Sequence, residues 1–235
     1  MPLDDPDLVR KQYAREDNLR ARQAIYEEMT GPDPRDVLWD AIAAVRPRRV
    51  LEVGGGPGEL SERMARDLGA DVAYVDISPR MVELARARGV DAEVGDAQRL
   101  RFDDGTFDCV LAAWMLFHLP DVDAGLVELA RVLRPGGRLV AATNADEHMR
   151  ELRAIAGLGP VQPIFTRENG GELLGRRFAD VERRDVDGWV TIHDRDTVEG
   201  FVASLHLETQ PELASYELPL RSRRASSVFV ATKAT

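Results

Sequence analysis

Short apolar runs alternate with amphipathic stretches over the central part of the chain. Each run has the composition of a strand that is buried on both faces, and the stretches between them repeat apolar residues at helical spacing, as Leu60, Met64 and Leu68 do. Five strands that alternate with four helices predict an α/β fold, doubly wound, with a mostly parallel sheet and right-handed crossovers. The runs cover residues 50–53, 72–76, 90–94, 107–114 and 138–143.

Helical segments precede the first strand. Residues 5–29 predict one broken or two short helices that end before a Gly-Pro pair. Asp33 then caps a further helix with Pro34 in its first turn. We expect residues 1–46 to form an N-terminal helical lid over the open edge of the sheet, and simple packing against the sheet is the alternative. Tyr13 and Arg22 are the polar lid residues placed to reach a ligand.

Residues 47–235 are expected to form the ligand-binding domain, with extra segments after the fifth strand. Helical patterns cover residues 144–156, a short stretch around Leu173 and Leu174, and residues 197–207. Segments inserted late in such a fold lie above the ligand, so the segments at about 144–178 and 193–220 are expected to shape a substrate pocket.

A glycine-rich turn follows the first strand, which ends in Glu52. Glycine permits positive φ and removes the Cβ atoms that would block a ligand, and the next helix begins with free N–H groups. The spacing fits neither the dinucleotide fingerprint nor the P-loop, because Glu59 replaces the last glycine of the first and no lysine is near for the second. A tight structural turn is the alternative. The glycines are Gly54, Gly55, Gly56 and Gly58.

Acidic residues end the next two strands. Asp76 lies about 20 residues beyond the glycine turn, the spacing at which a carboxylate meets ribose hydroxyls in such folds. Asp96 ends the third strand, where it is placed to accept from an adenine amino group. Met81, in the first turn after Ser78, is expected to lie against the adenine face. Glu52, Asp76, Asp96 and Trp114 all fall at carboxyl strand ends, where ligands bind in these sheets.

The composition limits the kinds of partner and the cell compartment that we expect for this chain. The formal net charge of -10 argues against a nucleic acid as the main partner. Cys109 is the only cysteine, so no internal disulfide forms and a reducing compartment is favoured. The N-terminus carries no secretory signal and the longest apolar run is too short to span a bilayer, so we expect a cytoplasmic protein with no membrane partner. The oligomeric state stays open between a monomer and a homodimer.

Six motifs follow one another between about residues 45 and 143. They are Glu52-Val53-Gly54-Gly55-Gly56-Pro57-Gly58, Val75-Asp76-Ile77-Ser78, Gly95-Asp96-Ala97, Phe107-Asp108, His118-Leu119-Pro120-Asp121 and Arg131-Val132-Leu133-Arg134-Pro135-Gly136-Gly137. In order and spacing the set resembles the class I S-adenosylmethionine (SAM) dependent methyltransferases. Gly55 departs from that family, which often has a bulkier residue there.

The resemblance implies a Rossmann-like sheet of seven strands with the last strand inserted antiparallel, and residues 181–192 and 227–232 fit the two added strands. It implies SAM as cofactor and S-adenosyl-L-homocysteine (SAH) as product. The cofactor-binding residues that we expect are Tyr13, Arg22, Glu52, Gly54, Gly55, Gly56, Gly58, Asp76, Ile77, Met81, Gly95, Asp96, Ala97, Ala113 and Trp114.

Methyl transfer from a sulfonium is an in-line displacement, so catalysis is mostly alignment. His118 is the candidate catalytic base, because an imidazole titrates near neutral pH and this one follows the fourth strand. A structural histidine at a helix start is the alternative. His148, His193 and His206 have no recognisable partner in the sequence. The aromatic faces suited to a sulfonium are Trp114, Phe117, Tyr13 and Tyr26.

Other methyltransferase types fit poorly. The fourth strand lacks the Asn/Asp-Pro-Pro motif of DNA amino methylation, Cys109 lies within a buried strand, and Asn144 with Asp146 makes a poor metal site, so no metal is expected. The favoured substrate is a small organic molecule, a metabolite or natural-product intermediate, with an O, N or C nucleophile. The alternative is a SAM-binding protein of this fold that does not methylate, and a tRNA or protein methyltransferase is a weaker third.

Overall fold

A computed structural model describes residues 5–13, 16–159, 164–205 and 211–235. Within them, eight strands form one sheet in the order β1-β7-β8-β6-β5-β2-β3-β4. The strands are β1 (Met29–Thr30), β2 (Arg49–Val53), β3 (Asp71–Asp76), β4 (Asp91–Val94), β5 (Phe107–Ala113), β6 (Leu133–Asn144), β7 (Asp180–Ile192) and β8 (Leu220–Thr232). The helices are α1 (Pro6–Gln12), α2 (Glu16–Ala24), α3 (Pro34–Val45), α4 (Glu59–Leu68), α5 (Pro79–Ala87), η1 (Leu116–His118), α6 (Val122–Val132), α7 (Arg150–Ile155), α8 (Arg167–Gly175) and α9 (Arg195–Ala203).

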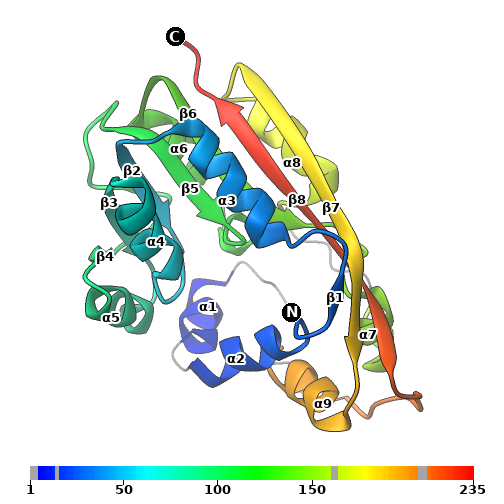
Figure 1. Cartoon of the computed structure of the whole chain (residues 1–235). Helices are drawn as coiled ribbons and strands as arrows, with labels where there is room; N and C mark the ends of the chain where they lie inside the picture. Colours follow the sequence, from blue (N-terminus) through cyan, green and yellow to red (C-terminus); the bar gives the residue numbers. More distant parts are fainter. Residues whose placement is uncertain (1–4, 14–15, 160–163, 206–210) are drawn as a thin grey trace.

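The expected doubly wound topology is confirmed. Strands β4, β3, β2, β5 and β6 run parallel, and β8 lies antiparallel between β6 and β7. The β7–β8 ribbon continues beyond the parallel strands, with α7 and α9 beside its far end (Figure 1). Because the parallel strands share one direction, β2, β3, β5 and β6 all end at the same edge of the sheet, and the site lies there.

Helices cover both faces of the sheet. On one face, Leu38 and Ile42 of α3 and Met64 of α4 join the buried side of the strands. On the other, Leu126 of α6 and Leu174 of α8 pack on the sheet in a second core. Both cores consist of side chains that are almost fully buried, and apolar burial of this extent is the main driving force for folding. Leu60, Met64 and Leu68, the stripe seen in the sequence, all pack into the first core.

Four predicted boundaries were wrong. The expected helix over residues 5–29 ends at Ala24, and Met29–Thr30 forms β1, so the sheet has an eighth strand that the sequence did not reveal. Strand β6 begins at Leu133, before the Pro-Gly-Gly stretch that we had placed outside it. The helix expected over residues 144–156 begins only at Arg150. The expected helix over 197–207 ends at Ala203, and its last two residues lie outside the described residues.

The N-terminal helices divide between two locations. Helices α1 and α2 lie beyond the carboxyl ends of the parallel strands, whereas α3 packs on the sheet (Figure 1). Ile25, just after α2, joins Val198 and Phe201 of α9 in a separate apolar cluster, so α2 and α9 support each other. A lid function is therefore a proposal for α1 and α2 only. None of the helices in the described part of the chain has the length and apolar character needed to cross a membrane.

Candidate functional site

A cavity of about 290 Å³ opens at the carboxyl edge of the sheet. Twelve of the fifteen expected cofactor-binding residues line it, together with the candidate base His118: Tyr13, Glu52, Gly54, Gly55, Gly56, Asp76, Ile77, Gly95, Asp96, Ala97, Ala113 and Trp114. Residues that the sequence reasoning missed complete the wall: Pro6, Val9, Gln23, Pro57, Glu59, Leu60, Val75, Gln98, Met115, Leu119 and Pro120. The structure thus brings together side chains from all the strand ends that the sequence indicated.

Arg22, Gly58 and Met81 do not line the cavity. The Arg22 guanidinium lies over the Tyr13 ring and donates to the carbonyl of Ser204 at 2.8 Å. Gly58 is the N-cap of α4, where φ is +80° and a Cβ would lie 2.7 Å from the Cβ of Ala85. Met81 is 1 % exposed, because the first turn of α5 directs it into the core rather than toward a ligand. Met81 is thus no lining residue of the cavity, and its contact with adenine stays a prediction.

Glu52 is buried beneath the glycine turn. Its side chain is 1 % exposed and accepts a short hydrogen bond from the hydroxyl of Ser61 on α4. A Cβ at residue 55 would overlap the Glu52 carboxyl group. The glycine that departs from the family pattern is therefore the one that leaves room for this carboxyl. Burial raises the pKa of Glu52 to about 7, the Ser61 hydrogen bond opposes the shift, and the charge of Asp76 adds to it.

Asp76 is held rigidly at the end of β3. One carboxylate oxygen accepts from the Ser78 N–H at 2.8 Å, and the other from the Tyr74 hydroxyl at 2.9 Å. Tyr74 also lies 2.6 Å from the carbonyl of Gly56, so it ties Asp76 to the glycine turn. Burial raises the pKa of Asp76, and the hydrogen bonds from Ser78 and Tyr74 oppose the rise. A carboxylate oxygen accepts more than one hydrogen bond, so acceptor capacity toward the cavity is left.

Of the three acidic residues at the strand ends, Asp96 is exposed, whereas Glu52 and Asp76 are buried. Its carboxylate accepts from the backbone N–H of Gln98 at 2.9 Å and from the side-chain amide of Gln98 at 3.1 Å. The amide oxygen of Gln98 accepts from the N–H of Asp121 at 3.0 Å, which joins this loop to the start of α6. Gln98 therefore offers both a donor and an acceptor beside the Gly95-Asp96-Ala97 motif.

His118 contacts Tyr13, the residue that follows α1, at the cavity wall. The one-turn helix η1 ends at His118, and its Nε2 lies 3.3 Å from the hydroxyl oxygen of Tyr13. The Tyr13 carbonyl accepts from the Ser78 hydroxyl at 3.1 Å, and Arg22 reaches the Tyr13 hydroxyl at 3.5 Å. Tyr13 thus bridges the loop after β3 and the segment after β5. The sequence named both residues but gave no sign that they touch.

Trp114 follows β5 in a strained backbone conformation. Its φ is +52°, which non-glycine residues rarely adopt, and its N–H bonds to the carbonyl of Ala142 at 2.8 Å. The indole N–H donates to the side-chain oxygen of Asn144 at 3.2 Å. Backbone strain of this kind clusters at functional sites, and here it lies in the cavity wall.

Tyr26 and the other histidines are placed elsewhere. The Tyr26 hydroxyl lies 3.0 Å from Nε2 of His148, and burial raises the pKa of Tyr26 to about 12 and lowers that of His148 to about 4. His193 lies exposed at 2.8 Å from Glu28, and His206 lies outside the described residues. Phe117 packs against the His118 ring and does not line the cavity. No group of three metal-ligating side chains occurs within the described ranges.

Comparison with known proteins bears on this site. A family model described as "Methyltransferase domain" matches residues 51–141. A demethylmenaquinone methyltransferase of Renibacterium salmoninarum is 39% identical over 191 residues, 72% of this chain and 78% of the relative. The chain belongs to the class I SAM-dependent methyltransferases.

Two further proteins compare with this class I methyltransferase. A demethylmenaquinone methyltransferase of Beutenbergia cavernae is 43% identical over 129 residues, 52% of this chain and about half, 53%, of the relative. The structure of a Haemonchus contortus phosphoethanolamine N-methyltransferase, solved with phosphomonomethylethanolamine and SAH, aligns with a TM-score of 0.64 at 19% identity. That alignment covers 96% of this chain and 60% of the other, and it shows a shared fold.

The buried carboxyl of Glu52 makes the stability of this methyltransferase depend on pH. Because the folded-state pKa is raised to about 7, the stabilisation is present below the ordinary value of 4.5 and is lost as the pH rises through 7. Glu52→Gln keeps an acceptor for Ser61 without the charge. We expect it to raise the free energy of unfolding at pH 8 by on the order of 3 kcal/mol, and by less than about 1 kcal/mol at pH 5.

Urea unfolding at the two pH values measures this difference. Glu83→Gln, at an exposed position of α5, is the matched control and should change stability little at either pH. Equal effects of Glu52→Gln at pH 5 and pH 8 would show that the ionisation of Glu52 is not the cause.

The fit between Gly55 and Glu52 gives a second prediction. Gly55→Ala should lower the free energy of unfolding by about 1–3 kcal/mol, because the new methyl group overlaps the Glu52 carboxyl. The loss should shrink when Glu52 is also replaced by alanine, as a double-mutant cycle in urea would measure. Gly171→Ala in α8, where a Cβ meets nothing closer than 4.0 Å, is the control and should not destabilise. An undiminished loss in the double variant would refute the contact.

Proposed function

We propose that this chain binds SAM in the cavity and transfers its methyl group to a small organic acceptor. The observation that carries the proposal is the charge of the wall. Among the described lining residues there is no lysine or arginine, whereas Glu52, Asp76 and Asp96 reach it from three successive strand ends. Such a wall suits a cationic sulfonium and disfavours a phosphate-bearing ligand.

Each part of the cofactor has residues that fit it. We assign the amino-acid end to the glycine turn and the first turn of α4, whose N-cap Gly58 provides no side-chain cap for the free N–H groups. The ribose hydroxyls are assigned to Asp76, and the adenine to Ala97, Asp96 and Gln98. The carboxyl of Glu52 lies beneath the turn, where a bound cation would favour its ionised form.

When bound, SAM supplies an electrophilic methyl group on a sulfonium. The chain's own residues then align the acceptor and take its proton. His118 is the proton acceptor in this proposal, with its Nε2 facing the cavity wall, and the Tyr13 hydroxyl at 3.3 Å holds the ring and offers a second polar contact to the acceptor. Trp114 lines the same cavity, and an aromatic ring suits a positive charge. Helix α1 contributes Pro6 and Val9, which exclude water.

The acceptor is assigned only by class. The names of the two demethylmenaquinone methyltransferases support a small organic molecule and make demethylmenaquinone one compound for a screen of alcohols, phenols, amines and carbon nucleophiles. Binding of SAM and SAH without methylation of any acceptor would favour the alternative, a SAM-binding protein of this fold with another role.

Asp76→Ala should weaken SAM binding about tenfold or more, because two hydrogen bonds from the ribose hydroxyls to a charged acceptor are lost. Calorimetry with SAM measures the dissociation constant. Asp71→Ala removes an exposed acid at the opposite end of the same strand and is the matched control, with unchanged affinity expected. Unchanged affinity in Asp76→Ala would refute the ribose assignment.

His118→Ala should lower kcat by about 10²-fold or more while the SAM dissociation constant changes little, since a general base acts in the transition state. Tyr13→Phe keeps the ring and removes the hydroxyl, and a smaller fall in kcat with a displaced pH profile is expected. His193→Ala, an exposed histidine remote from the cavity, is the control. Equal turnover in His118→Ala would leave this histidine with a structural role.

A further inference from the structure

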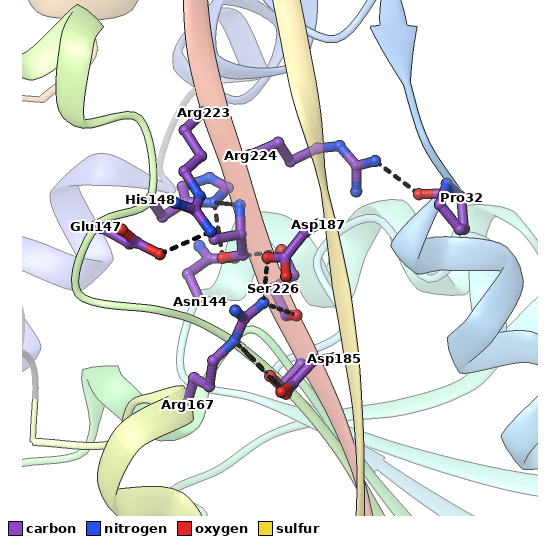
Figure 2. A network of polar contacts seen from close by, with 12 residues as sticks. Pro32, Asn144, Glu147, His148, Arg167, Asp185, Asp187, Arg223, Arg224 and Ser226 are labelled. Carbon is purple, nitrogen blue, oxygen red and sulfur yellow. Dashed lines mark hydrogen bonds and ion pairs between the residues drawn. The ribbon is translucent and has the colours of Figure 1, made fainter.

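A polar network along β8 reaches the cavity through one side chain. Arg167, Asp185 and Asp187 surround the middle of β8, with His148 and Arg224 nearby on either side (Figure 2). Asn144, the last residue of β6, is the member of this network that also contacts the cavity wall. Asn144 has no role in the methyl transfer that we propose.

Asn144 is held in one orientation. Its side-chain oxygen accepts from the Ser226 hydroxyl at 2.9 Å and from the Trp114 indole N–H at 3.2 Å. The indole N–H can only donate, so the oxygen and not the amide nitrogen of Asn144 must face Trp114, and the Ser226 hydroxyl donates to the same oxygen. Ser226 is 2 % exposed and pairs with Asn144 in the β6–β8 ladder, and its carbonyl accepts from Arg167 at 2.5 Å. The network therefore fixes the acceptor atom on which the indole depends.

Trp114 needs such a contact. The torsion that turns an aromatic ring about its bond to Cβ has broad wells, so packing alone defines the ring plane poorly. The backbone at Trp114 is fixed by the positive φ and the bond to Ala142, but these leave the ring free to turn. A hydrogen bond at the indole edge selects one plane for the ring of Trp114, which is a lining residue of the cavity.

We propose that Asn144 is a positioning residue for the cofactor, which sets the plane of the Trp114 ring against the bound sulfonium. The inference rests on the proposed function, because it assigns the ring to that ligand. It extends the site to β8, since the Asn144 side chain is set in turn by Ser226.

Three substitutions test the role. Asn144→Leu removes the acceptor, Asn144→Asp keeps an acceptor oxygen, and Trp114→Phe keeps a ring without the N–H group. By calorimetry, Asn144→Leu should weaken SAM binding about fivefold to tenfold and Asn144→Asp by less than about twofold. In the Trp114→Phe background, Asn144→Leu should add less than about twofold, because its effect passes through the indole. The same pattern is expected in kcat/KM.

Two results would overturn the proposal: wild-type affinity in Asn144→Leu, or an equal loss in the Trp114→Phe background. If Asn144→Leu fails to fold, the SAM affinity of Ser226→Ala is measured in its place. It frees the Asn144 side chain, and its effect on SAM affinity should likewise disappear in the Trp114→Phe background.

A ligand-free measurement checks the contact itself, and SAM binding by the wild type separates this test from the proposed function. The indole N–H resonance of Trp114, identified by its absence in Trp114→Phe, should move and exchange faster with water in Asn144→Leu. If wild-type protein binds neither SAM nor SAH, the proposed function fails and the positioning role fails with it, whatever the resonance shows. If the wild type binds SAM and Asn144→Leu binds it equally well, only the role of Asn144 is overturned.

Discussion

Uncompensated negative charge at one edge of the sheet is the constraint on which the site depends. Within the described residues, Glu52, Asp76 and Asp96 have no basic partner, although many other acids of this chain are paired with arginines. Burying a carboxylate without a counter-ion is costly, and the pKa of Glu52 rises in response. Hydroxyl and N–H donors from Ser61, Tyr74 and Ser78 lower that cost, because they form hydrogen bonds to the carboxyl groups of Glu52 and Asp76. A cationic ligand is the partner that such an arrangement lacks.

The same edge connects α1 and α2 to the cavity. Ser78 caps α5, contacts Asp76 through its N–H and holds the carbonyl of Tyr13 through its hydroxyl. Arg22 of α2 attaches this helical segment to a second place, because it donates to the carbonyl of Ser204 after α9. The position of α1 is therefore linked both to the loop that we assign to the ribose and to a C-terminal segment that we expect to shape the substrate pocket. The Tyr13–His118 contact lies between these two attachments.

The sequence was informative where the chemistry is local. Apolar periodicity located the five parallel strands, and the acids at their ends were found because parallel strands place them at one edge. It was uninformative where two distant segments meet. Nothing in the sequence pairs Tyr13 with His118 or Trp114 with Asn144, and the reason for Gly55 became visible only with the Glu52 side chain in place. The burial of Met81 was also not visible in the sequence, because a helix's first turn has an inward face as well as an outward one.

Strand β8 follows β7 in the sequence, yet it lies between β6 and β7 in the sheet and holds Ser226 against Asn144. Before it arrives, one side of β6 has no partner and β7 has no place in the sheet. Contacts of such long sequence separation form slowly, because the chain must first close a large loop. A growing polypeptide would therefore carry an open, adhesive edge at β6 until β8 has emerged. The contact between Ser226 and Asn144 is likewise postponed until β8 is synthesised.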